Sequence, residues 1–141
     1  MYKRQLLYIS HDVSVVAQIC NKVAVMYAGK MTEYGETTTL FKRGYHPYFL
    51  GLKNAFINIT QTEEPIFIPG SPPNLLDPPK GCRFYPRCPF TVDICKESEP
   101  EFREVESGHY VACHNADKAD EFRELARKRD TWLNPRSEEE S

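Results

Sequence analysis

Residues 6–35 read LLYISHDVSVVAQICNKVAVMYAGKMTEYG, and this stretch decides the fold of the first part of the chain. The apolar run 6–9 predicts a buried strand. Apolar residues then recur at three- and four-residue spacing up to Cys20, which predicts an amphipathic helix. Ser10 or Asp12 can cap this helix, because either side chain accepts hydrogen bonds from the free amides of a first turn.

Two further strands and two short helices follow from the pattern. Residues 22–27 (KVAVMY) and 30–34 (KMTEY) predict a hairpin that turns at Gly29. Residues 37–41 predict a short helix capped by a threonine, and a longer helix begins near Pro47, whose missing amide costs nothing in a first turn. The fold class is therefore α/β, with a strand and helix, a hairpin and short helices.

The rest of the chain is expected to lack a core of its own. Apolar residues thin out after Ile68, and eight prolines between 65 and 89 exclude a regular helix and disfavour a central strand. Residues 116–132 are strongly charged with three sparse apolar positions, which predicts one surface helix followed by a fraying tail.

Composition excludes several classes of protein. The 141 residues carry a formal net charge of −2, which argues against nucleic acid or an anionic membrane surface as a partner. No apolar run approaches the roughly 20 residues that span a bilayer, and the first ten residues lack the apolar region of a signal peptide. The chain is expected to be cytosolic, with reduced thiols available to metal.

The stretch 81–114, GCRFYPRCPFTVDICKESEPEFREVESGHYVACH, holds four of the five cysteines in a polar loop. We expect thiolates that converge on a metal to hold this loop in place of a hydrophobic core. No pair has the two-residue spacing that dominates structural zinc sites, and the wider gaps favour a four-iron cluster. Zinc is the second reading and ordinary free thiols the third; the candidate ligands are Cys82, Cys88, Cys95 and Cys113.

Other residues near this loop could support the metal site. His109 and His114 flank Cys113 and could replace a thiolate, although four cysteines make neither necessary. Three cationic residues near the cysteines would favour deprotonated thiols, namely Arg83, Arg87 and Lys96. The alternative is that each is an ordinary solvated surface charge. Cys20 stands outside the loop and is expected to be a buried structural thiol. His46 is expected at a helix start and not in catalysis.

The stretch 6–35 resembles the C-terminal end of the nucleotide-binding domain of ATP-binding cassette (ABC) transporters. Three later motifs resemble, more specifically, the ATP-binding subunits of oligopeptide and dipeptide importers. They are YHPYFLGL (45–52), IPGSPPNL (68–75) and the cysteine pattern that begins GCRFYPRCPF (81–90). The resemblance covers nearly everything from Leu6 to about His114.

The resemblance implies roles for particular residues. His11 falls on the switch histidine, which in the family contacts the γ-phosphate of ATP and helps to hold the attacking water. A histidine at a strand end can do this by donating to a phosphate oxygen. The alternative reading is that His11 merely sits in the turn between strand and helix. The cysteine loop corresponds to the part in which this family is described as carrying a four-iron (4Fe–4S) cluster.

Several parts of the family pattern are absent. The glycine loop G-x-x-x-x-G-K-[ST], the magnesium-binding acidic residue and the glycine-rich signature do not occur in the sequence. The chain thus resembles the last third of a subunit, and we expect it to be inactive alone. We predict three regions: the end of a nucleotide-binding domain (1–44), the transporter-type extension (45–115), and a charged helix and tail (116–141).

The resemblance implies an ATP-hydrolysing subunit of a peptide importer. ATP and Mg²⁺ would bind the full-length subunit only, and the partners would be a second ABC ATPase subunit and the transmembrane permease subunits. Substrate peptide would be met only indirectly, nucleic acid is not expected, and the location would be peripheral, at the cytoplasmic face of the membrane. The alternative is a freestanding iron–sulfur or zinc module for interaction or redox sensing.

Overall fold

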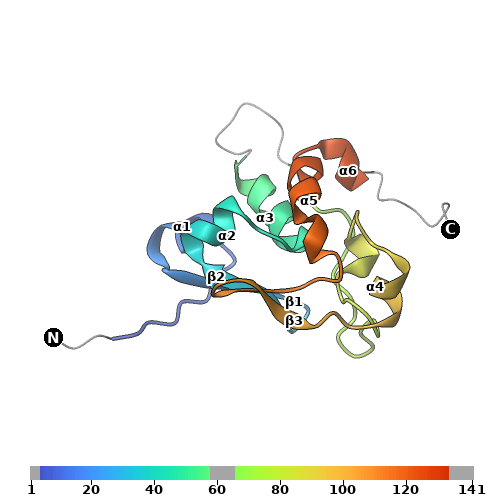
Figure 1. The fold of residues 1–141 in the computed structure, drawn as a ribbon, viewed down its shortest axis with the longest axis horizontal. Coiled ribbons are helices and arrows are strands. Elements are labelled where there is room, and N and C mark those ends of the chain that lie inside the picture. The colour runs from blue at the N-terminus through green and yellow to red at the C-terminus, as the bar shows by residue number, and fades with distance from the viewer. Residues whose placement is uncertain (1–3, 58–65, 134–141) are drawn as a thin grey trace.

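The computed structural model describes residues 4–57 and 66–133. These residues form a mixed α/β fold in which one antiparallel sheet is accompanied by short helices (Figure 1). In chain order the elements are α1 (Val13–Ile19), β1 (Lys22–Tyr27), β2 (Lys30–Glu36), α2 (Thr37–Lys42), α3 (Pro47–Ile57), η1 (Tyr85–Arg87), α4 (Asp93–Glu97), β3 (Phe102–Glu106), β4 (His109–Ala112), η2 (Ala116–Lys118), α5 (Ala119–Ala126) and α6 (Arg129–Leu133).

The sheet joins the two halves of the chain. Its strand order is β1-β2-β4-β3, and every neighbouring pair is antiparallel. The two hairpins therefore pair through their central strands, β2 and β4, where Glu33 lies opposite Val111 and Tyr34 opposite Tyr110. The hairpin β3–β4 lies inside the cysteine-rich loop and was not predicted, because its charged residues hide the alternation of its inward positions, His109 and Val111.

The predicted hairpin at Gly29 is confirmed. Ala28 and Gly29 both have positive φ, of 49° and 80°. Two central residues in this region form the turn whose twist matches that of two antiparallel strands. A side chain other than that of glycine is strained there, and Ala28 tolerates the conformation because it is small.

The helix after the first apolar run is also confirmed, with Asp12 as its cap. The Asp12 carboxylate accepts hydrogen bonds from the amides of Ser14 (3.0 Å) and Val15 (3.2 Å). The strand predicted over residues 6–9 is wrong in this structure. These residues form no strand, and Leu6, Leu7 and Ile9 are each more than four-fifths exposed, because no described strand lies beside them to pair their backbone.

The helices at 37–42 and 47–57 agree with the prediction. The cap predicted for the first one differs, because Glu36 occupies the N-cap position without a side-chain hydrogen bond. The Thr37 hydroxyl instead donates to the carbonyl of Cys20 at 2.6 Å. This bond ties α2 to the C-terminal end of α1.

The second half of the chain contributes much of the core, contrary to the expectation of a weakly cored tail. One cluster packs β1 and α3 against the cysteine loop and the last helices, and a smaller one lies under α2. The first contains Tyr27, Leu50, Ile66, Phe84, Phe90, Phe122, Ala126 and Trp132, and the second contains Val25, Leu40 and Phe49.

The single surface helix predicted for 116–132 is wrong. The segment forms η2, α5 and α6, and its aromatic residues Phe122 and Trp132 are buried. Figure 1 shows α5 beside α3, and the two helices are in contact. The sequence hid this arrangement because a short helix with few apolar positions can bury all of them while its charged positions face water.

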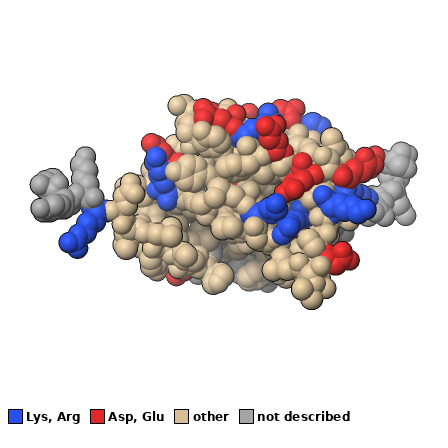
Figure 2. Space-filling model, turned by 90° about the horizontal axis from the view of Figure 1, so that it is seen from below, with Lys and Arg blue, Asp and Glu red and all other residues tan. Residues whose placement is uncertain are grey.

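Charged side chains of both signs lie side by side on the face drawn in Figure 2, which also has a broad uncharged area. This mixture agrees with the small net charge of the chain. In residues 4–57 and 66–133 no helix has the length and apolar character needed to cross a membrane.

Candidate metal centre

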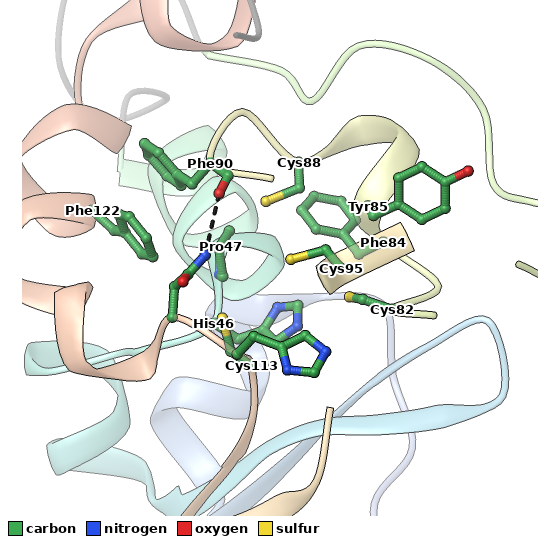
Figure 3. A pocket seen from close by; sticks show the side chains of 12 residues that line it. His46, Pro47, Cys82, Phe84, Tyr85, Cys88, Phe90, Cys95, Cys113 and Phe122 are labelled. Atoms are coloured by element: carbon green, nitrogen blue, oxygen red, sulfur yellow. Dashed lines mark hydrogen bonds between the residues drawn. The ribbon is translucent and has the colours of Figure 1, made fainter. Parts of the chain in front are cut away.

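The four cysteines predicted as ligands line one cavity. Three separate pieces of chain bring them there. Cys82 and Cys88 flank the short helix η1, Cys95 lies in α4, and Cys113 directly follows β4. Figure 3 shows the four sulfur atoms gathered around this space, with the ring of His46 beside them.

Close backbone contact holds two of these pieces together. The amide of Cys82 donates to the carbonyl of Cys95 at 2.8 Å. A Cβ atom at Gly81 would lie 2.1 Å from that same carbonyl oxygen, which no real contact permits. Glycine at position 81 therefore allows the two cysteine-bearing segments to approach.

Apolar packing also surrounds the cavity, so the expectation that metal must replace a core in this loop is wrong. Phe84 and Phe90 are buried, and the Phe90 ring stacks on Phe122 of α5 at 4.2 Å between centroids. Pro47 at the start of α3 completes the apolar wall. The sequence hid this core because its partners lie far away in the chain.

Burial shifts the pKa of three of the four cavity thiols. It raises the pKa of Cys82 and Cys88 above the usual thiol range, and it raises the pKa of Cys113 to about 12. In each case the amide of the residue two positions further along hydrogen-bonds the sulfur and opposes this rise. Those amides are positioned to stabilise a thiolate, whereas the apolar surroundings favour the neutral thiol.

The arginines predicted to favour thiolates bind elsewhere. The Arg83 guanidinium donates to the carbonyl of Ala28 in the β1–β2 turn. The Arg87 guanidinium donates to the carbonyls of Pro69 (3.0 Å) and Ile68 (3.2 Å). Both side chains thus anchor the cysteine loop to neighbouring segments.

The histidines have distinct positions. His114 lines the cavity, and its Nε2 lies 2.7 Å from the carbonyl oxygen of Ser98. His46 also lines it, is 2 % exposed, and has a pKa lowered to about 3 by burial. Sequence reasoning placed His46 only at a helix start, because nothing in YHPY reveals which loop lies against it.

A buried carboxylate, also missed, anchors this region. Both oxygens of Glu33 in β2 accept hydrogen bonds, from the amides of Tyr45 (2.8 Å) and His46 (3.0 Å). His109 of β4 places its Nε2 2.6 Å from Glu33 Oε1. The signal in the sequence was a charged residue at an inward position of a strand, and its partners could not be known.

The thiols surround the cavity without converging on a point. Within the described ranges, no group of three or more His, Cys, Asp or Glu side chains could hold a single metal ion. The fifth cysteine, Cys20, is partly buried at the end of α1 and does not line the cavity.

His11 lies in the exposed bend before α1. The bend is fixed on both sides of it, because the Asp12 amide donates to the Ser10 hydroxyl at 2.9 Å and the Asp12 carboxylate caps the helix. The imidazole is thus presented to solvent from an ordered backbone.

Comparison with known proteins places the chain in a family. Residues 32–95 match the C-terminal region of oligopeptide/dipeptide transporters. The dipeptide transport ATP-binding protein DppD of Caldanaerobacter subterraneus is 42 % identical over 81 % of the chain and 35 % of its own length. The oligopeptide transport ATP-binding protein OppD of Escherichia coli is 46 % identical over 79 % of the chain and 33 % of its own length. AppF of Bacillus subtilis, with the same description as OppD, is 43 % identical over 77 % and 34 %.

The chain spans about a third of the length of these curated relatives. The match agrees with the mixed α/β fold and with the resemblance that the sequence motifs indicated. The chain belongs to the family of oligopeptide and dipeptide ABC transporter ATP-binding proteins, and it carries their C-terminal region.

Proposed function

We propose that this chain acts within the ATP-binding subunit of an ABC transporter that couples ATP hydrolysis to peptide import. The observation that carries the proposal is the similarity to named peptide-transport ATP-binding proteins over about four-fifths of the chain. In this proposal the full-length subunit binds ATP and Mg²⁺ and works with a second ATPase subunit and the permease subunits. It lies at the cytoplasmic face of the membrane and meets peptide only through the complex.

His11 is proposed as the switch histidine of that subunit. Its exposed position and its fixed backbone support this role, because phosphoryl transfer depends on groups held in place before the reaction. The imidazole would donate to a γ-phosphate oxygen and orient the attacking water.

This role has a kinetic test in a full-length subunit with this C-terminal sequence. His11→Ala should lower ATP turnover by orders of magnitude and leave nucleotide affinity nearly unchanged, because the contact serves the transition state. Gln18→Ala, exposed on α1, is the matched control and should hydrolyse ATP at the normal rate. A fall in affinity as large as the fall in rate would assign His11 a structural role instead.

We further propose that Cys82, Cys88, Cys95 and Cys113 hold a 4Fe–4S cluster. Two observations support the fit: four thiols face one largely apolar cavity, and backbone amides point at three of the sulfurs. A cubane has iron at four separate corners, so its ligands stand farther apart than those of one zinc ion. When bound, such a cluster can carry one electron or tie the loop together.

Metal analysis tests the cluster. Anaerobically purified protein should be brown, absorb broadly near 400 nm, and contain close to four iron atoms and four sulfides per chain, as the cluster type requires. Serine at any one of the four positions should remove iron, whereas Cys20→Ser should retain it. Colourless protein with one zinc ion per chain would show that the site binds zinc and not a cluster.

The alternative from the sequence, a freestanding metal-binding module, would gain support from one result. It requires the chain to fold cooperatively as a soluble monomer and to carry out an interaction or redox reaction without ATP-binding partners. Loss of peptide uptake in a reconstituted transporter that bears His11→Ala would argue against it.

A further inference from the structure

The His46 side chain is a polar group in the apolar wall of the thiol cavity. The residue directly precedes α3 and is 2 % exposed, and its ring lies 5.9 Å from that of Phe84 between centroids. It also forms part of a second cavity, which shares Cys82 and Phe84 with the first. The imidazole therefore lies where the two cavities adjoin.

Hydrogen bonds fix both the orientation and the proton of this ring. The amide of Tyr48 donates to His46 Nδ1 at 3.1 Å, so Nδ1 acts as an acceptor and carries no proton. A neutral imidazole whose Nδ1 accepts must carry its proton on Nε2. The His46 amide in turn donates to the buried carboxylate of Glu33 at 3.0 Å. The backbone and the ring of His46 are thus each held by a hydrogen bond.

The position of this N–H group has a chemical consequence. A protonated Nε2 cannot ligate a metal, but it can donate a hydrogen bond to sulfur. A sulfur that a bound group places within reach of Nε2 would be an acceptor for this donor, and a buried donor left without an acceptor costs about 1–3 kcal/mol. His114, the other histidine of the cavity, has its Nε2 engaged with the Ser98 carbonyl at 2.7 Å.

We propose that His46 is a positioning residue that donates its Nε2–H to a sulfur of the iron–sulfur group in this cavity and thereby raises its reduction potential. This inference rests on the cluster proposed above. Hydrogen bonds to cluster sulfurs are among the features that set the potential of such groups. The direction follows from charge: the reduced group is one unit more negative, so a donor stabilises it more than the oxidised group.

Two substitutions separate the cap from the donor. His46→Asn can retain an acceptor near Nδ1 for the Tyr48 amide, but its side chain is too short to reach the position of Nε2. His46→Gln can place an amide N–H near the position of Nε2 and loses the acceptor that caps α3. If His46 has only a structural role, the variant that loses the cap should be less stable and the two variants should have the same reduction potential. A donor role predicts that the two variants differ in potential.

The experiment uses the full chain reconstituted anaerobically with ferrous iron and sulfide, followed by redox titration of the visible absorption. At a fixed solution potential, His46→Asn should show at least a tenfold lower ratio of reduced to oxidised protein than wild type. This ratio corresponds to a shift of about 59 mV to more negative potential for a one-electron couple. His46→Gln should stay near the wild-type potential and melt at a lower temperature.

His114→Asn is the matched control. It removes the second histidine of the same cavity, whose Nε2 faces the Ser98 carbonyl, and it should leave the potential unchanged.

Each other outcome decides against a specific claim. Equal potentials in wild type, His46→Asn and His46→Gln, with brown protein in every case, would overturn the role of His46 and leave the cluster standing. This is also the result expected if Nε2–H points into the second cavity. Wild-type protein that takes up no iron and sulfide would overturn the cluster itself, and the role of His46 with it.

Discussion

Glu33→Gln tests whether one buried carboxylate holds the β2–β4 edge to the start of α3. Glu33 is fully buried and receives two backbone amides and His109 Nε2. Glutamine keeps one acceptor oxygen and turns a donor toward the other amide. One buried amide then lacks an acceptor, which costs about 1–3 kcal/mol, and the remaining hydrogen bonds lose a charged partner worth about 1 kcal/mol more than a neutral one. We expect Glu33→Gln to lower the free energy of unfolding by about 3 kcal/mol.

Equilibrium urea unfolding followed by circular dichroism measures this loss as a difference in midpoint at constant slope. The matched control is Glu36→Gln, three residues along the same strand, where the side chain is exposed and caps nothing. It should lie within about 0.5 kcal/mol of wild type. A Glu33→Gln protein as stable as the Glu36→Gln protein would refute the argument that the three donors depend on a charged acceptor.

Two further substitutions test the unpredicted core and one partly buried cation, Lys53. Trp132→Ala should cost about 3–5 kcal/mol in the same urea assay, because it empties a buried site in the first cluster, whereas Leu133→Ala at the exposed neighbour should cost little; equal midpoints would contradict the placement of α6. Burial, with Arg127 and Arg123 nearby, lowers the pKa of Lys53. The unfolded chain therefore holds that proton more tightly than the native protein between the lowered value and 10.5, so stability rises with pH across this window. Lys53→Met should be more stable than wild type at neutral pH, and the difference in free energy of unfolding between the two proteins should shrink as the pH approaches 10.5. A difference that does not change with pH would show that the titration of Lys53 does not cause it.

Local signals carried the first part of the fold. The turn at Gly29, the Asp12 cap and the Pro47 helix start each depend on residues within a few positions, and each appears in the structure where the sequence places it. The strand expected over residues 6–9 failed for the opposite reason. An apolar run states a preference for burial, but a strand needs a neighbouring strand, and no described strand lies beside this one.

The candidate site was predictable in its ligands and not in its surroundings. Cysteine spacing identified four thiols that do face one cavity. The wall of that cavity comes from His46, Phe84 and Phe122, which are separated by tens of residues and carry no local sign of their contact. Glu33 illustrates the same limit, since a charge at an inward strand position indicates a buried partner without saying which one.

The β2–β4 pairing also bears on the order of events during synthesis. Glu33 and His109 are 76 residues apart in the chain, so the central edge of the sheet cannot close until the whole cysteine-rich segment has left the ribosome. At about 5–20 residues per second this takes on the order of 4–15 seconds. For that time β2 presents unpaired backbone groups, which is the situation in which nascent chains associate with one another. A codon change that slows translation between the two hairpins should therefore lower the yield of folded protein without altering a single residue.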